Sequence, residues 1–240
     1  MTAGAVASGA TADAPDDRVI EFRGVARTFG SNPPVYALRR VDLTIKRGEW
    51  LTIVGPSGSG KSTMLNILGL LDRQSEGTYL FEGEDVGALR DLDRTGLRAR
   101  KIGLVFQSFH LMPHRTVLEN VMIAELYRGS PRQGRRERAR EALNRVGLED
   151  RADFLPTQLS GGQQQRTAVA RALIGQPALL LCDEPTGNLD SHTTRSLLDM
   201  FDGLNDDGLT LVVITHDDDV AKRGSRSVRI VDGLLSEMSS

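Results

Sequence analysis

The chain has 240 residues, a formal net charge of −2 and 39% hydrophobic against 26% charged residues, which predicts a folded protein of one to two domains and excludes a mostly disordered chain. The charge balance lacks the basic excess of nucleic-acid-binding proteins, so no nucleic acid is expected as a partner. The single cysteine, Cys182, excludes an internal disulfide and a cysteine-based zinc site and favours a reducing, cytoplasmic environment.

Residues 1–17 are rich in small and acidic residues and lack the positive start and apolar core of a signal peptide. We expect them to form a disordered tail. No later stretch approaches the run of about 18 to 20 apolar residues that spans a bilayer. If the protein acts at a membrane, a separate chain must therefore cross it.

Strand-like and helix-like segments alternate after this tail. Segments 19–22 and 41–45 alternate apolar and polar residues around a Gly- and Pro-containing loop, which predicts an antiparallel pair of strands. Continuous apolar runs predict strands covered on both faces, as in parallel sheets. They occupy residues 50–54, 102–106, 178–183 and 210–215. The expected fold class is α/β, a mostly parallel sheet with an antiparallel edge subdomain.

Helical periodicity replaces the strand pattern in segments 116–127 and 132–148. We expect a helical subdomain of residues 108–165 inserted into a core of residues 18–107 and 166–235. The arginines of segment 132–148 alternate with glutamates, which is typical of a solvated helix face, and a lipid- or partner-binding patch is the alternative.

Residues 50–63, WLTIVGPSGSGKST, read as strand, Gly-rich turn and helix, and the turn matches GxxxxGK[ST] in full. In such a P-loop, backbone N–H groups converge on phosphate oxygens and the following helix adds its partial positive charge. Lys61 is expected to reach the β and γ phosphates, and the Ser62 hydroxyl to bind Mg²⁺. The candidate nucleotide-binding residues here are Gly55, Pro56, Ser57, Gly58, Ser59, Gly60, Lys61, Ser62 and Thr63.

Two acidic residues end the buried run LLLCDEP. Asp183 is expected to hold Mg²⁺ through water, and Glu184 to orient and deprotonate the attacking water. The alternative, an acidic helix cap, is disfavoured by the P-loop upstream. Cys182 is expected to fill the core.

These motifs, together with LSGGQ at residues 159–163, resemble the nucleotide-binding subunits of ATP-binding cassette (ABC) transporters over nearly the whole chain. The resemblance implies a P-loop NTPase core with an inserted signature subdomain, ATP hydrolysis coupled to translocation, and ATP and Mg²⁺ as cofactors. It also implies that Tyr36 stacks on adenine, that Gln107 touches Mg²⁺ and senses the membrane partner, and that His216 contacts the γ phosphate.

The serine and glycines of LSGGQ open a helix whose N-terminal amides attract an anion. Because the P-loop already surrounds its own phosphates with donors, a second such turn in one site is redundant. The resemblance implies that two chains pack head to tail, so that Ser160, Gly161, Gly162 and Gln163 cover the nucleotide on the opposite chain. Asp190, in the run NLD, is then expected along that interface.

The runs around Gln107 and LLLCDEPTGNLDS are most similar to the branch that serves lipoprotein release, macrolide and antimicrobial-peptide export, and a related cell-division complex. This implies a peripheral subunit at the cytoplasmic face of the membrane, paired with a second ATP-binding subunit, expected as a homodimer, and with a separate permease. An ATP-driven switch that controls cell-wall hydrolysis or division is the alternative. A DNA-repair or translation cassette is disfavoured, because neither a coiled-coil insertion nor a second cassette is present.

The permease is expected to dock just after Gln107. The apolar residues there are Phe109, Leu111, Met112, Pro113 and Val117. The alternative is that they pack the helical subdomain against the core.

Overall fold

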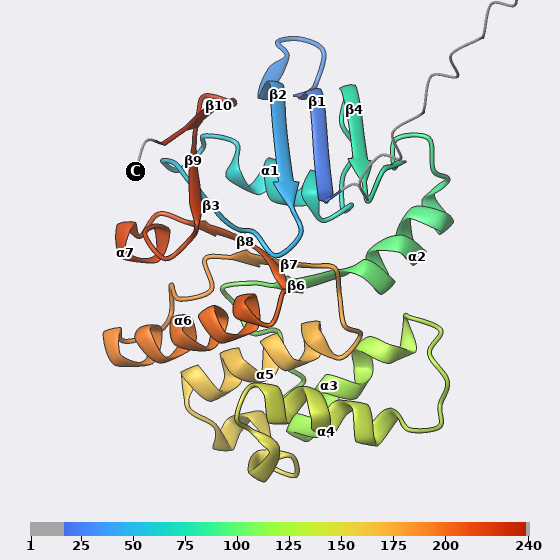
Figure 1. Ribbon diagram of the computed structural model, residues 1–240, viewed down its shortest axis with the longest axis vertical. Helices are drawn as coiled ribbons and strands as arrows, with labels where there is room; N and C mark the ends of the chain where they lie inside the picture. Colours follow the sequence, from blue (N-terminus) through green and yellow to red (C-terminus); the bar gives the residue numbers. More distant parts are fainter. Residues whose placement is uncertain (1–16, 239–240) are drawn as a thin grey trace, which may run out of the picture.

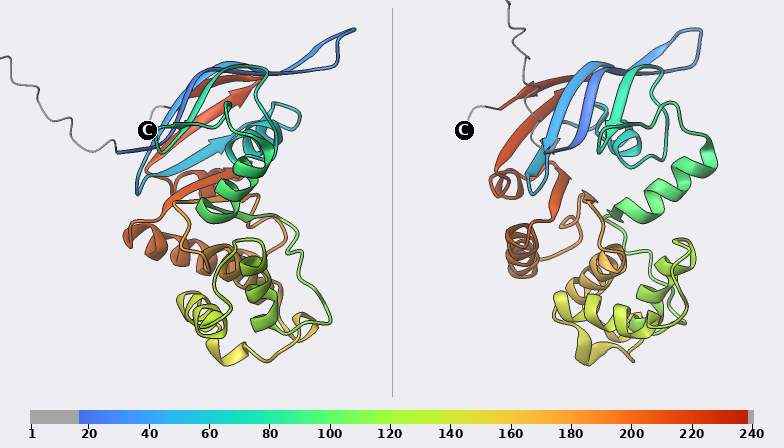
Figure 2. Two further views of the ribbon diagram at one scale, coloured as in Figure 1. Left: turned by 90° about the vertical axis from the view of Figure 1, so that its right-hand side faces the viewer. Right: turned by 45° about the vertical axis from the view of Figure 1, so that its right-hand side comes forward.

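Two sheets and several helices make up residues 17–238, which are the residues that the computed structural model describes (Figure 1). The helices within residues 117–173 form a lobe, called the helical lobe below. The tail expected at residues 1–17 lies, apart from Asp17, outside the described residues. Figure 2 shows the antiparallel sheet and the helical lobe at opposite ends of the molecule, with the central sheet between them. Within residues 17–238, no helix combines the length and the apolar character needed to cross a membrane.

The central sheet confirms the α/β expectation. Its strand order is β10-β9-β3-β8-β7-β6, and the pairs from β9 through β6 are all parallel. The strands are β3 (Trp50–Val54), β6 (Ile102–Val105), β7 (Leu179–Asp183), β8 (Thr210–Thr215), β9 (Arg226–Val231) and β10 (Leu234–Glu237). Every residue of β3 and β8 is buried, as the continuous apolar runs predict for strands covered on both faces.

The two strands expected at 19–22 and 41–45 do pair antiparallel, but each extends well beyond the predicted segment. They belong to a separate sheet of order β2-β1-β4-β5. The strands are β1 (Arg18–Phe29), β2 (Val35–Lys46), β4 (Glu76–Phe81) and β5 (Glu84–Asp85). Phe22 and Tyr79 meet edge to face at 4.7 Å on its inner side, in a cluster that also contains Met64 of α1 (Lys61–Leu68). This cluster joins the antiparallel sheet to one face of the central sheet.

The other face of the central sheet packs on helices. They are α3 (Val117–Met122), α4 (Arg135–Arg145), α5 (Gly161–Leu173), α6 (Ser191–Asp206) and α7 (Asp218–Ala221). Helix α2 (Asp91–Lys101) instead contributes Leu97 to the first cluster. Short 3-10 turns are Ile123–Leu126, Glu149–Arg151 and Pro156–Gln158. A second hydrophobic cluster contains Val117, Leu143 and Val169 from the lobe together with Leu180 and Val213 of the sheet, so the lobe and this face of the sheet share one core.

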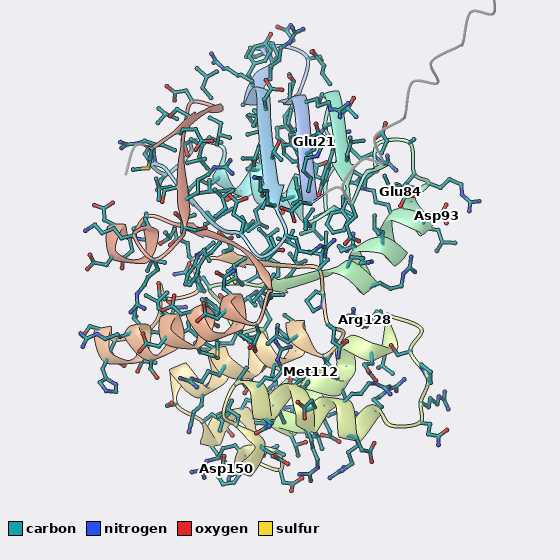
Figure 3. The ribbon with its side chains drawn as sticks, in the orientation of Figure 1. Glu21, Glu84, Asp93, Met112, Arg128 and Asp150 are labelled. Atoms are coloured by element: carbon teal, nitrogen blue, oxygen red, sulfur yellow. The ribbon has the colours of Figure 1, made fainter. Side chains whose placement is uncertain are left out.

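Arginines hold the lobe together and attach it to the core. Glu125 is 2% exposed and accepts hydrogen bonds of 2.6 and 2.8 Å from Arg138 of α4, whose side chain is 38% exposed. Arg128, labelled in Figure 3 where the lobe faces α2, donates to the carbonyl oxygens of Arg100 and Gly175. Arg128 therefore links the lobe to α2 by a hydrogen bond to its last turn.

Candidate active site

The turn between β3 and α1 leaves no room for side chains at two of its glycines. A Cβ on Gly55 would lie 2.2 Å from the carbonyl oxygen of Ile230, and one on Gly60 would lie 2.4 Å from that of Ala37. Gly60 also has a φ of +109°, which L side chains rarely adopt. The spacing of the P-loop glycines therefore reflects close packing of the loop between β2 and β9.

Lys61 is the first residue of α1, and its ammonium group lies over the loop. Its Nζ donates to the carbonyl oxygens of Gly55 and Pro56 at 2.7 and 2.9 Å. The Ser59 hydroxyl is buried and has no hydrogen-bond partner among the described residues. The Lys61 ammonium group, positioned over the loop, and the Ser59 hydroxyl, left unpaired within the described part of the chain, suit the loop to an anionic ligand.

A cavity of about 840 Å³ opens over this loop and extends to the ends of β6 and β7. Of the residues predicted from sequence, it is lined by Tyr36, Ser57, Gly58, Ser59, Gly60, Lys61, Ser62, Thr63, Gln107, Asp183 and Glu184. Gly55 and Pro56 belong to the loop but do not line the cavity. Pro34, Val35, Ala37, Arg39, Asp232 and Gly233 complete the lining and were not predicted.

The acidic pair at the end of β7 faces this cavity. Burial raises the pKa of the Asp183 carboxyl, the neighbouring Glu184 raises it further, and Lys61 opposes both. Glu184 has a φ of +45°, and its backbone N–H donates to the carbonyl oxygen of Ile214 in β8 at 2.9 Å. Its Oε1 lies 2.7 Å from Nδ1 of His216. Because β7 and β8 are parallel neighbours, their carboxyl ends bring these two side chains together.

Gln107 follows β6 and reaches the same cavity from the other side. Its Nε2 lies 3.4 Å from Oδ1 of Asn188, and Nδ2 of Asn188 donates to the Gln107 carbonyl oxygen at 3.0 Å. The sequence pattern placed Gln107 correctly at the end of a strand but gave no sign of this partner.

The oxygen donors around the cavity fit Mg²⁺ that arrives with a nucleotide. Ser62 offers a hydroxyl, Gln107 an amide oxygen and Asp183 a carboxylate, and oxygen is the ligand atom that Mg²⁺ prefers. Within residues 17–238, no group of three or more His, Cys, Asp and Glu side chains could hold a metal by itself. Mg²⁺ typically uses one or two carboxylates together with substrate phosphates, so this small donor set suits it.

The signature turn lies outside this cavity. Ser160 is the N-cap of α5, where its Oγ accepts from the Gln163 backbone N–H at 3.3 Å and its own N–H donates to the Gln163 side chain at 3.0 Å. A Cβ on Gly162 would lie 2.2 Å from Cγ2 of Thr193 in α6. None of Ser160, Gly161, Gly162 and Gln163 lines the P-loop cavity of their own chain.

Asp190 is the N-cap of α6, a role that the sequence interpretation missed. Its carboxylate accepts hydrogen bonds from the Thr193 hydroxyl at 2.6 Å and from the backbone N–H groups of Thr193 and His192 at 2.9 and 3.0 Å. These bonds, that of the Thr193 hydroxyl first, hold the pKa of Asp190 below its ordinary value.

The structure corrects one member of the expected docking surface. Val117 is fully buried in the core shared by the lobe and the sheet, because it opens α3 with its side chain turned inward. Met112, labelled in Figure 3, is 49% exposed, and Pro113 beside it is also exposed. Phe109 and Leu111 are half-buried.

A P-loop beside a buried strand that ends in an acidic pair, at the carboxyl edge of a mostly parallel sheet, defines a P-loop NTPase. The family described as "ABC transporter" matches residues 38–187. The chain belongs to this family. It is accordingly an ATP-binding cassette with ATPase activity.

Curated relatives agree with this assignment. An uncharacterized ABC transporter ATP-binding protein of Thermotoga maritima is 51% identical over 84% of this chain and 86% of its own length. YknY of Bacillus subtilis, another uncharacterized ABC transporter ATP-binding protein, is 46% identical over 92% and 97%. The pyoverdine export ATP-binding/permease protein PvdT of Pseudomonas syringae pv. syringae is 46% identical over 90% of this chain, which spans only 33% of PvdT.

Solved cassettes share the fold. The dimeric structure of MJ0796, described as a bacterial ABC transporter cassette, has a TM-score of 0.81 and 43% identity and matches 92% of this chain and 99% of that one. A dimeric post-hydrolysis state of the same cassette, bound to ADP and Pi, has a TM-score of 0.81 and 42% identity over the same shares.

Proposed function

We propose that this chain is the ATP-hydrolysing subunit of an ABC transporter that exports or extracts its cargo through a separate permease. The observation that carries the proposal is the separation of two phosphate-binding elements: the P-loop, Gln107, Asp183 and Glu184 line one cavity, while the signature turn lies outside it. A turn of this composition at a helix N-terminus favours an anion. The second copy of the chain is the partner that brings the turn and the cavity together.

In this proposal, the P-loop amides and Lys61 hold the β and γ phosphates, and Ser62, Gln107 and Asp183 hold Mg²⁺, Asp183 through water. When bound by these residues, Mg²⁺ would neutralise charge that develops on the phosphate oxygens. Glu184 accepts a proton from the water that attacks the γ phosphorus, as the bond to the β–γ bridging oxygen breaks and leaves ADP. His216, 2.7 Å from Glu184, orients this carboxylate and contacts the γ phosphate.

Tyr36 is proposed to stack on adenine. It is 55% exposed and lines the cavity on β2, beyond the P-loop. Phe29 at the end of β1 pairs in register with Val35, another lining residue, and is 40% exposed under the guanidinium of Arg27. Phe29 is therefore the competing ring for the same role.

ATP is proposed to join two chains, each covering the other's nucleotide with Ser160, Gly161, Gly162 and Gln163. The dimeric solved relatives support this arrangement. A few charge-assisted hydrogen bonds, worth about 1.5 to 3 kcal/mol each, are enough to switch association on when ATP binds and off after hydrolysis.

The relatives favour a membrane partner and export. Two relatives, the pyoverdine export ATP-binding/permease protein PvdT and the macrolide export ATP-binding/permease protein MacB, each match this chain at 46% identity, so in them a similar cassette is joined to a permease. We propose that this chain binds its permease at the cytoplasmic face of the membrane. Exposed Met112 and Pro113, with the half-buried Phe109 and Leu111, form the proposed docking surface.

Size-exclusion chromatography with light scattering tests the proposal on the Glu184→Gln variant. Hydrolysis is expected to slow by on the order of 10² to 10⁴. The variant is expected to run as a monomer without nucleotide and as a dimer with ATP and Mg²⁺. An ATP-saturated variant that remains monomeric at micromolar concentration contradicts the shared site.

A further inference from the structure

Gln107 and Glu184 lie on different loops, so ATP hydrolysis depends on how these two loops are held relative to one another. Gln107 follows β6, and Glu184 follows the neighbouring strand β7. Backbone pairing between the strands stops at Val105 and Cys182, before either residue. The backbone of Glu184 is held by β8, and contacts between the β6 and β7 loops themselves come from side chains that span them.

Gln165 of α5 bridges the two loops from inside the protein. It is fully buried, and its Nε2 lies 2.8 Å from the carbonyl oxygen of Pro185 and 3.4 Å from that of Phe106. Pro185 directly follows Glu184, and Phe106 directly precedes Gln107. One amide group thus donates to both loops next to their functional residues, while its Oε1 has no partner among the described residues.

Asn188 bridges the same loops at the surface. Its amide exchanges hydrogen bonds with Gln107, one to the backbone carbonyl at 3.0 Å and one from the side chain at 3.4 Å. The preceding Gly187 makes room for this contact, because a Cβ there would lie 2.7 Å from Nε2 of Gln107. The buried Gln165 and the exposed Asn188 therefore connect the same two loops, one from inside the protein and one at its surface.

We propose that Gln165 and Asn188 are positioning residues for hydrolysis: their amides fix the distance between Gln107 and Glu184. This inference rests on the roles proposed above for those two residues. Gln165 also lies on the helix that begins at Ser160, so the element that faces the opposite chain's nucleotide is tied to the hydrolytic groups of its own chain.

The test compares Gln165→Met and Asn188→Ala with the control Gln164→Ala. Methionine keeps the length of glutamine without its donors and removes the unsatisfied Oε1, so folding is expected to survive. The kcat for ATP is expected to fall about 10- to 100-fold in Gln165→Met, since small misplacements near the reacting groups carry penalties of this size. The kcat of Asn188→Ala is expected to fall by a smaller factor. The Gln164 side chain donates to the carbonyl oxygen of Leu159, just before its own helix, and Gln164→Ala should keep the wild-type kcat.

The Kd for ATP separates positioning from general damage. Neither bridge touches the P-loop, so both variants are expected to bind ATP with the wild-type Kd, and Gln165→Met combined with Glu184→Gln should still dimerise with ATP. A wild-type kcat in both variants overturns the inference, and so does a loss of kcat matched by a loss of ATP binding or of dimer. If Gln165→Met does not fold, the kcat and Kd of the surface variant Asn188→Ala alone test the inference. Wild-type protein that neither hydrolyses ATP nor dimerises would instead refute the proposed function.

Discussion

His216 and Glu184 lie within hydrogen-bond distance, 2.7 Å between Nδ1 and Oε1, although 32 positions separate them in the sequence. The contact exists because β8 and β7 are parallel neighbours, so the residues that follow them meet at the carboxyl edge of the sheet. The side chain of His216 is 73% exposed and that of Glu184 only 17%, so the histidine covers the carboxylate from the solvent side.

His216→Ala tests this pair. Removing the imidazole leaves Glu184 without its orienting partner, so kcat is expected to fall on the order of 10²-fold, the lower end of the range for acid–base groups. ATP binding should persist, because the P-loop and Lys61 are unchanged. Steady-state ATPase assays and equilibrium ATP titration measure the two quantities. A variant with the wild-type kcat would show that the contact has no part in hydrolysis.

Tyr36→Ala and Phe29→Ala identify the ring that stacks on adenine. Loss of a stacking contact worth about 0.5 to 1.5 kcal/mol weakens ATP binding several-fold and leaves the binding of inorganic triphosphate unchanged. We expect this pattern in Tyr36→Ala because Tyr36 lines the cavity. Calorimetric titration of both ligands checks it. If only Phe29→Ala weakens ATP binding without affecting triphosphate binding, Phe29 is the ring that stacks on adenine.

Gly162→Ala tests the contact between the signature helix and α6. Its Cβ would meet Thr193 at 2.2 Å, so α5 must shift and ATP-dependent dimerisation in the Glu184→Gln background is expected to be lost. Gly203→Ala is the matched control, because it lies in α6 with nothing within 4 Å of its added Cβ. Helix propensity predicts that this control is more stable by about 1 kcal/mol and still dimerises. Dimer formation by both variants would show that ATP-dependent dimerisation does not need the close packing of Gly162 on Thr193.

The lowered pKa of Asp190 gives its helix cap a pH dependence. A carboxylate with a depressed pKa stabilises the fold above the ordinary aspartate pKa of about 3.9, and this contribution is lost as the pH falls through the lowered value. Asp190→Ala should therefore be less stable than wild type at pH 7, by a margin that narrows below about pH 3.9. Urea unfolding across pH measures it. Asp153→Ala is the control, since the Asp153 side chain is 75% exposed and its carboxylate faces Arg136 at 3.6 Å.

The sequence predicts best where one physical cause dominates a whole segment. Burial on both faces requires unbroken apolar runs, and β3 and β8 match the predicted segments 50–54 and 210–215 residue for residue. The P-loop is similarly determined, because its glycines are required by close backbone packing at Gly55 and Gly60. The carboxyl ends of the parallel strands then place Gln107, Glu184 and His216 along one edge of the sheet.

Elements with little apolar periodicity were missed. In α2 only Arg94 and Leu97 are buried, and Gly96 interrupts its centre, so no helical stripe is visible. β9 was also missed, although its buried Val228 and Ile230 alternate with exposed residues in the period-2 pattern of a half-exposed strand.

Contacts between distant segments left no trace in the sequence. Gln165 is one of three consecutive glutamines, and only the fold shows that its amide is buried between two loops. Val117 was assigned to the docking surface from its apolar character, which is the same whether a residue packs inward or outward. Exposure of a single side chain depends on tertiary packing that periodicity over a short helix does not determine.

The central claim is that each nucleotide is bound by the P-loop of one chain and the signature turn of the other. A structure of Glu184→Gln with ATP and Mg²⁺, by crystallography or cryo-electron microscopy, tests it most directly. The account predicts a two-fold dimer in which Ser160 and the N–H groups of Gly161 and Gly162 hydrogen-bond to the γ phosphate held by the opposite Lys61. An ATP-loaded structure in which these residues face solvent and one chain makes every phosphate contact would contradict it.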